Sequence, residues 1–177
     1  MLTRYLAPSF VTSSFLYHGS PHRQGAIAFG LPGNQAPTIT AGQPFYVTNS
    51  LKYARHFARG GVVSALQFTQ GAIIDFHHLK LLDHLLDIYN QDPKIVQDDG
   101  PWNEEFEGSI DGSPYRLLES PAVMQYLQDQ GFSAVFLPED IELNVTALAI
   151  LDAGSVEFSH MMPESILRHH DEAFDGP

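Results

Sequence analysis

The segment Phe15-Leu-Tyr-His-Gly-Ser-Pro21 organises the sequence, because a short apolar run ends here in a turn that carries a histidine. Its first three residues, two aromatic and one aliphatic, suit a half-buried strand. Gly19 lets another backbone or a flat ligand approach closely, and His18 supplies two ring nitrogens. Two interpretations follow: a strand that ends in a turn with a satisfied histidine, or a strand that brings His18 and Gly19 to a binding site.

Size and charge limit the class of protein. The chain has 177 residues, 44% hydrophobic and 11% aromatic, which predicts a single domain spanning residues 1–177 with its own core. Its formal charge is −12, from 21 acidic and 9 basic side chains. Such a field repels phosphate backbones and anionic membrane surfaces, which argues against nucleic acid as a partner. Cysteine is absent, so disulfides and thiolate metal sites are excluded.

Targeting signals are also missing from the sequence pattern. The N-terminal residues contain no sustained apolar region and no small-residue cleavage site, which argues against a cleaved secretory signal. No segment approaches the run of about 18 apolar residues that a membrane-spanning helix needs. We therefore expect a cytoplasmic protein without a membrane partner, or one delivered into a host or competitor cell without a cleaved signal peptide.

Strand and helix signals follow one another irregularly, which predicts an α+β fold rather than regular βαβ units. After the first strand, further strands are predicted at residues 44–48, 62–68, 72–76, 132–137, 145–151 and 155–158. Helices are predicted at 51–59 and 79–89, followed by two short helices that begin at Pro114 and Pro121. Segments rich in glycine, proline or acidic residues predict loops at 21–43, 90–112 and 138–144.

A second motif, Phe45-Tyr-Val-Thr-Asn-Ser-Leu-Lys-Tyr-Ala54, follows the long loop. Taken with Tyr17-His-Gly-Ser20, it resembles the first two motifs of the ADP-ribosyltransferase superfamily, in the diphtheria-toxin/poly(ADP-ribose) polymerase branch with the His-Tyr-Glu pattern. In that branch a strand ends on His-Gly-Ser/Thr, and a later strand reads apolar-Tyr-Phe before a Ser-capped helix. The resemblance covers these motifs and the loop between them, and the remainder only by the order of elements.

The resemblance implies an ADP-ribosyltransferase-like fold, in which a split mixed or antiparallel sheet is flanked by helices and carries a helical insert. It also implies that NAD is the substrate that donates ADP-ribose, and that a protein accepts it. NAD carries a flat nicotinamide on a ribose, and cleavage of the bond between them develops positive charge on the sugar. The site must therefore hold an aromatic ring and orient a ribose.

The same resemblance implies a role for each matching residue. Tyr46 would stack on the nicotinamide, and Phe57 would close the other side of the ring. Gly19 would present its backbone groups to the carboxamide. His18 would hydrogen-bond a ribose hydroxyl and so fix the orientation of the sugar. Ser20 would add a polar contact beside it.

The family pattern also places an acid at the start of a late core strand, where it stabilises the oxocarbenium-like transition state. This sequence departs from the pattern, because Thr146 or Ala147 stands at the usual position. The acids that precede the strand are Glu139, Asp140 and Glu142. Glu142 is the preferred candidate for the catalytic carboxylate, and Asp140 is the next.

Other interpretations of the aromatic and histidine residues stay open. Tyr46 also suits an inward-facing tyrosine of a strand, and Phe57 falls on the apolar side of its helix, where it would join the core. The pairs His77-His78 and His169-His170 do not predict a metal site. Adjacent histidines point to opposite faces of a strand, and no acids are spaced to complete a ligand set.

Basic side chains offer candidates for the pyrophosphate of NAD. Arg23 lies in the predicted long loop, close in sequence to the histidine motif. Lys52, Arg55 and Arg59 form a basic stripe on the helix that follows the second motif. Such a stripe is commonly a solvated face, although in so acidic a chain it also suits the pyrophosphate or an acidic partner.

Together, the residues and the resemblance predict a mono-ADP-ribosyltransferase that transfers ADP-ribose from NAD to a macromolecule, with a protein as the preferred acceptor. The expected role is that of a toxin, an effector or a phage anti-defence factor of the anti-CRISPR type. NAD hydrolysis without transfer is a close alternative. A further alternative is a non-catalytic acidic inhibitor or immunity protein that keeps the fold and binds a basic partner.

Overall fold

The computed structural model describes residues 15–20, 44–76, 79–92, 114–140, 145–163 and 166. The described strands are β1 (Leu16–Ser20), β2 (Phe45–Thr48), β3 (Val62–Phe68), β4 (Ala72–Asp75), β5 (Phe132–Asp140), β6 (Val145–Ile150) and β7 (Val156–Met161). The helices are α3 (Leu51–Ala58), α4 (Leu79–Gln91), α7 (Pro114–Glu119) and α8 (Pro121–Asp129), with a short 3₁₀ turn at Ala153–Ser155. The fold is α+β, as predicted.

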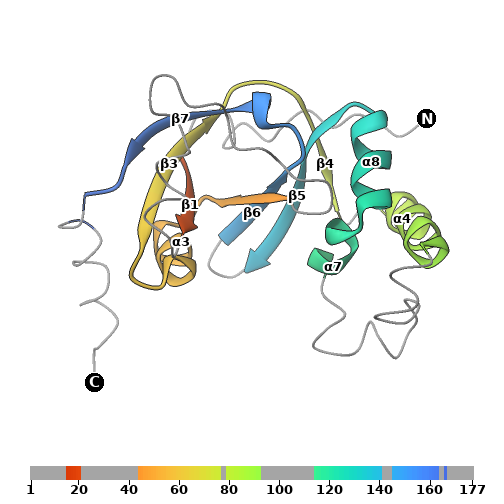
Figure 1. Ribbon diagram of the computed structural model, residues 1–177, viewed down its shortest axis with the longest axis horizontal. Helices are drawn as coiled ribbons and strands as arrows, with labels where there is room; N and C mark the ends of the chain where they lie inside the picture. Colours follow the sequence, from red (N-terminus) through yellow and green to blue (C-terminus); the bar gives the residue numbers. More distant parts are fainter. Residues whose placement is uncertain are drawn as a thin grey trace.

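The strands of the described residues form one mixed sheet of seven, in the order β4-β5-β6-β2-β1-β3-β7 (Figure 1). The β4–β5 pair is parallel, and the other five neighbouring pairs are antiparallel. Strands β1 and β2 therefore lie in the interior of the sheet, although both come from the N-terminal third of the sequence. The two sequence motifs are neighbours in space.

Local signals explain where the helices begin and end. Ser50 caps α3, because its hydroxyl oxygen accepts a hydrogen bond of 3.2 Å from the Tyr53 amide. Ser120 caps α8 in the same way, through the Val123 amide at 3.4 Å. Each such cap stabilises its helix by about 1 kcal/mol. At its other end α3 stops at Arg59, which has a left-handed backbone with φ 47°.

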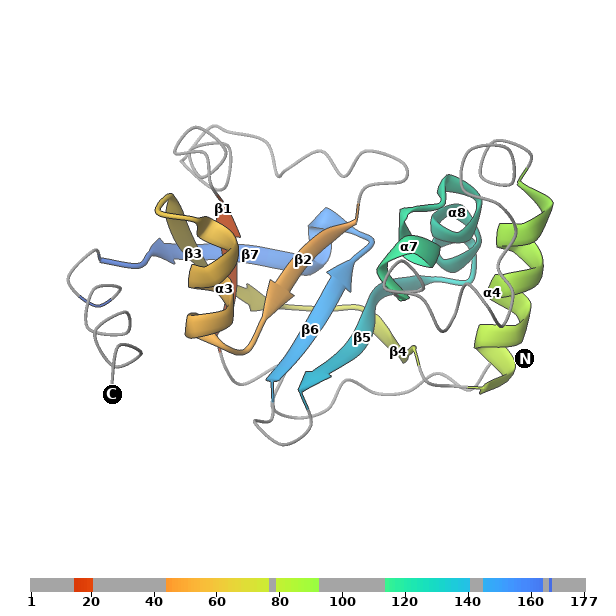
Figure 2. The ribbon, with the colours of Figure 1, turned by 90° about the horizontal axis from the view of Figure 1, so that it is seen from below.

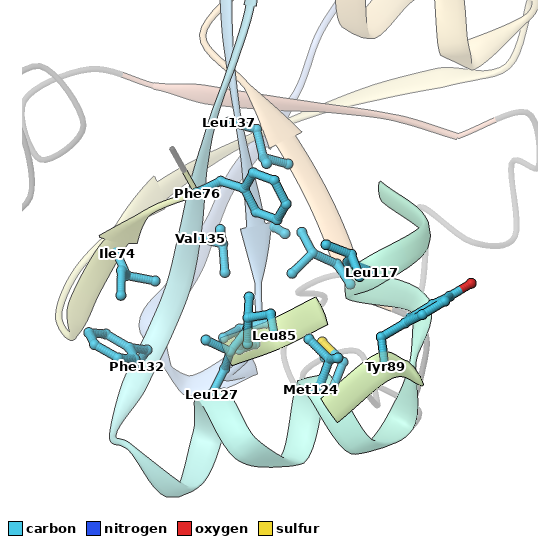
Figure 3. Packing of buried hydrophobic residues seen from close by; sticks show 14 of the residues in the cluster. Ile74, Phe76, Leu85, Tyr89, Leu117, Met124, Leu127, Phe132, Val135 and Leu137 are labelled. Carbon is cyan, nitrogen blue, oxygen red and sulfur yellow. The ribbon is translucent and has the colours of Figure 1, made fainter. Parts of the chain in front are cut away.

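The larger hydrophobic core lies between the sheet and helices α4, α7 and α8 (Figure 3). Leu85, Leu117 and Leu127 of these helices meet Val135 and Leu137 of β5, and all five side chains are buried. The opposite face of the sheet carries a second cluster around Leu16, Leu66 and Ile150. A third, small cluster joins α3 to the sheet through Ala54, Ala58 and Val63. Helices α3 and α7 lie on the same side of the sheet (Figure 2).

Most predicted elements agree with the structure to within one or two residues, but the loop predicted at 138–144 is wrong in its first part. Strand β5 continues through Pro138 to Asp140, and Asp140 pairs with Val145 of β6. Strand β4 pairs with β5 only as far as Phe136, so beyond that residue one edge of β5 has no β4 partner. A proline is tolerated there because its missing N–H interrupts no ladder. The predicted loop 21–43 and most of the segment 90–112 lie outside the described residues.

Candidate functional site

Strands β1 and β2 are joined by a ladder of one residue pair, Tyr17 opposite Thr48, whereas β1 pairs with β3 along its whole length. A side chain makes the next connection between the two strands. The Nδ1 atom of His18 donates a hydrogen bond of 2.8 Å to the backbone carbonyl of Tyr46. The first predicted motif is thus linked directly to the second at the position where their backbone pairing ends.

A cleft of about 470 Å³ opens at this position, between α3 on one side and the end of α7 on the other. Figure 2 shows both helices on the same face, with β2 between them. The cleft is lined by His18, Gly19, Ala147 and Glu119, and by a set of aromatic side chains. These aromatic residues are Tyr17, Phe45, Tyr46, Tyr53 and Phe57. A mostly apolar cleft with a few polar groups is the usual form of a small-molecule site.

Four of the predicted site residues therefore meet in one cleft: His18, Gly19, Tyr46 and Phe57. Ser20 is outside the lining of the cleft and pairs with Val62 at the end of β1. The remaining predictions, Arg23 and Glu142, lie outside the described residues.

Tyr46 is both a wall of the cleft and part of the protein interior. Its side chain packs against the larger core cluster, and its hydroxyl oxygen is buried. On β2, Tyr46 lies opposite Ala149 and Thr48 lies opposite Ala147 of β6. Because side chains of a strand alternate between faces, Tyr46 and Thr48 share one face of the sheet. The predicted inward-facing tyrosine and the predicted ring platform are thus compatible at this position.

Gly19 is required by helix α3. A Cβ atom at this position would fall on the carbonyl oxygen of Ala54 and would lie 2.8 Å from the amide nitrogen of Ala58. Of the two partners predicted for this glycine, another backbone is the one that the structure places there. The contact predicted between the Gly19 backbone and a nicotinamide carboxamide stays a prediction.

Helix α3 contributes an aromatic wall that includes one residue the sequence analysis missed. The rings of Tyr53 and Phe57 are 5.0 Å apart and nearly perpendicular, and both line the cleft. The prediction that Phe57 joins the core is wrong, because 51% of its surface is exposed. Ala54 and Ala58 make the contact with the sheet instead. The spacing of four residues between Tyr53 and Phe57 was the available signal for the pair.

His18 is held in its neutral form. Burial lowers the pKa of the imidazole below its ordinary value of 6.5, and the hydrogen bond to the Tyr46 carbonyl opposes this shift with a smaller effect. The carbonyl oxygen can only accept, so the proton of the neutral ring lies on Nδ1. In this tautomer Nε2 carries the lone pair and can accept a hydrogen bond. The ring also packs on Phe45, at 4.2 Å between centroids.

The acid expected at the start of β6 is not where the family pattern has it. Ala147, one of the two residues at that position, lines the cleft. Asp140 and Glu139 belong to β5, with Asp140 opposite Val145. Among the described residues, the acid that lines the cleft is Glu119, the last residue of α7. Sequence analysis missed it, because nothing in the local pattern of α7 indicates a site.

The basic stripe of α3 faces away from the cleft. At about 100° per residue, Lys52 and Arg55 lie on a different side of the helix from Tyr53 and Phe57. Arg59 follows the last helical residue. None of the three lines the cleft, and the Arg55 guanidinium donates to the Gly61 carbonyl at 3.4 Å. Contact of this stripe with a pyrophosphate in the cleft is therefore not supported by its placement.

Searches of protein-family models, of curated proteins and of solved structures find no match for this chain. Among the described helices, none is both long and apolar enough to cross a membrane. In the same part of the chain, no three histidine or acidic side chains are grouped so that they could hold a metal ion. The cleft is therefore the candidate functional site of the described residues.

Proposed function

We propose that this protein is an NAD-dependent mono-ADP-ribosyltransferase that transfers ADP-ribose to a macromolecule, with a protein as the preferred acceptor. The observation that carries the proposal is the meeting of the two sequence motifs. His18 and Gly19 of β1 share one cleft with Tyr46 of β2 and Phe57 of α3. The family resemblance depends on these residues acting together.

The shape and lining of the cleft suit the nicotinamide end of NAD. The nicotinamide ring of NAD is flat and positively charged, and faces of aromatic side chains attract such rings. Tyr46 approaches from the sheet, whereas Tyr53 and Phe57 approach from α3. A volume of about 470 Å³ lies within the range of small-molecule sites. We expect the ring to lie between these two groups of side chains.

His18 has a positioning role in this proposal. Its Nε2 atom accepts a hydrogen bond from a hydroxyl of the nicotinamide ribose, because Nδ1–H is already committed to the Tyr46 carbonyl. The lowered pKa of His18 favours the unprotonated form of Nε2 at neutral pH. Holding the sugar in one orientation lowers the entropic part of the barrier to reaction.

The reaction breaks the bond between C1′ of the ribose and the ring nitrogen of the nicotinamide. The bonding electron pair goes to that nitrogen, so nicotinamide leaves as a neutral molecule. A nucleophilic side chain of the acceptor forms the new bond to C1′ and loses its proton to solvent. Water in the place of the acceptor gives NAD hydrolysis by the same route.

A second candidate function is binding without catalysis, as an acidic inhibitor or immunity protein with a basic partner. The observation that favours it is Ala147, which lines the cleft and is one of the two residues, with Thr146, at the position where the family pattern has an acid. The formal charge of −12 suits electrostatic attraction to such a partner.

Mass spectrometry of cell lysates separates the two functions. The purified protein and NAD are incubated with bacterial and eukaryotic lysates, and the proteins are analysed for addition of ADP-ribose. The transferase proposal expects the modification with wild type and less of it with Phe57→Ala at an NAD concentration that does not saturate the variant. Neither modification of any lysate protein nor release of nicotinamide, from a protein that is folded by circular dichroism, would contradict the proposal.

A further inference from the structure

The end of helix α7 forms the side of the cleft that faces α3, and it adds an acidic residue to described lining residues that are otherwise uncharged. Among the described residues that line the cleft, Glu119 is the one acid, and none is a lysine or an arginine. With His18 neutral, Glu119 supplies the formal charge of the lining residues that the structure describes. A carboxylate beside aromatic side chains favours a ligand that is cationic or becomes so during reaction.

The backbone around Glu119 is fixed on both sides. Leu117, Leu118 and Ser120 are fully buried, whereas the Glu119 side chain is exposed. The Ser120 amide donates to the Leu117 carbonyl at 3.2 Å, and the Ser120 carbonyl accepts from the Met124 amide at 2.9 Å. The junction between α7 and α8 is therefore anchored in the core. It presents the Glu119 carboxylate from a rigid base, as a site residue requires.

We infer that Glu119 supplies the carboxylate of the NAD-cleaving site, in the place of an acid on β6. This inference rests on the proposed function. As the bond from C1′ to the nicotinamide nitrogen breaks and its electron pair moves to that nitrogen, positive charge develops on C1′ and the ring oxygen of the ribose. Glu119 stabilises this charge electrostatically and forms no covalent bond. The acceptor then adds to C1′ and releases its proton to solvent.

The position of Ala147 agrees with this assignment. Ala147 lies on β6 opposite Thr48, on the floor of the cleft, and its methyl group leaves room there. An acid at Ala147 would approach the ribose from the sheet, whereas Glu119 approaches from a helix. The cleft thus has an acidic residue on α7, where the family pattern would have one on the strand.

A purely structural role for Glu119 predicts different measurements. Glu119 directly precedes the Ser120 cap of α8, and an acid near the N-terminus of a helix interacts favourably with the helix dipole. In that role its removal lowers the melting temperature and leaves catalysis unchanged. The two roles are separated by measuring kcat, KM and thermal stability on the same variants.

The experiment compares Glu119→Gln, Glu119→Asp and the control Glu157→Gln, in the full-length protein, by release of nicotinamide from NAD. Glu157 is an exposed acid of the edge strand β7 and lies opposite Gln67, away from the cleft. We expect Glu119→Gln to lower kcat about 100-fold or more with KM changed by less than about 3-fold. Glu119→Asp restores part of kcat, and Glu157→Gln behaves as wild type.

Three results would overturn the inference. If the kcat of Glu119→Gln is within about 3-fold of wild type, Glu119 has no catalytic role, while the proposed function stands. A loss of melting temperature in Glu119→Gln, with kcat unchanged in the folded fraction, assigns Glu119 to the helix cap. Wild-type protein that binds NAD but releases no nicotinamide, either alone or with lysate proteins present as acceptors, overturns both the inference and the proposed function, because no reaction remains for the carboxylate to assist.

Discussion

His18 and Tyr46 are joined by a hydrogen bond of 2.8 Å from the imidazole Nδ1 atom to the backbone carbonyl, at the place where strands β1 and β2 cease to pair. The bond has two effects. It connects the two motifs on which the family resemblance depends, and it fixes the tautomer so that Nε2 is the acceptor. One interaction thus supports both the geometry of the cleft and the role proposed for the histidine.

Because His18 is buried in its neutral form, we expect the free energy of unfolding to depend on pH. Burial lowers its pKa from 6.5, so between the lowered value and 6.5 the unfolded chain binds more protons than the folded chain. The free energy of unfolding therefore falls as pH falls through this interval, by at most about 1.4 kcal/mol per pH unit for one proton. His18→Asn should flatten this part of the profile in urea unfolding measured at several pH values.

The control for this experiment is His160→Asn, at an exposed histidine of the edge strand β7. We expect its profile to keep the slope that His18→Asn loses. Equal slopes for wild type and His18→Asn would show that His18 does not become harder to protonate on folding.

We expect one added methyl group at Gly19 to destabilise the fold strongly. Gly19→Ala places a Cβ on the Ala54 carbonyl oxygen and should lower the free energy of unfolding by about 3 kcal/mol. Gly60→Ala is the matched control, because Gly60 has φ 84° and nothing within 4 Å of an added Cβ. Its cost should be only the about 1–2 kcal/mol of a left-handed backbone. Similar losses in both variants, by urea unfolding, would refute the close contact with α3.

A substitution at Phe57 should affect ligand binding but not the stability of the fold. Because 51% of its surface is exposed, Phe57→Ala should change the free energy of unfolding by less than about 1 kcal/mol. We expect it to weaken NAD binding about tenfold, since it removes one aromatic face of the cleft. Phe15→Ala is the control: Phe15 is 39% exposed and packs on His160, outside the lining of the cleft. Equal affinities for the two variants by calorimetry would exclude Phe57 from the site.

We expect removal of the Tyr46 side chain to reduce both the stability of the fold and the binding of NAD. Its ring packs against the core between the sheet and the helices, so Tyr46→Ala should cost about 3 kcal/mol. Tyr46→Phe keeps the ring and should retain NAD affinity within about threefold, because the proposed contact uses the face of the ring. A large loss of affinity in a folded Tyr46→Phe protein would indicate that the hydroxyl, rather than the ring, makes the contact.

Most helices and strands could be predicted because the residues that indicate each element lie within it or next to it in the sequence. The residues of β3 are mostly apolar, and α3 and α8 each begin after a serine that caps them. The end of β5 was missed for a physical reason. Pro138 indicates a loop unless one knows that β4 ends opposite Phe136, and that information lies in the sheet and not in the local sequence.

The site was predictable where its residues belong to the two motifs. Tyr53 could have been included, because it lies one helical turn before Phe57 on the same side of α3. Glu119 could not have been found in the same way. Its place in the cleft results from the packing of α7 against the core, through Leu117 and Leu118, and the sequence around it indicates only a short helix.

The central claim is that the cleft binds the nicotinamide end of NAD. It is tested most directly by calorimetric titration of the wild-type protein with a carbocyclic NAD analogue, whose bond to nicotinamide cannot be cleaved by this route. We predict binding of one analogue per chain, and affinity at least about tenfold weaker for ADP-ribose, which lacks the ring that the aromatic side chains contact. Absence of binding, or equal affinities for the two ligands, would contradict the account.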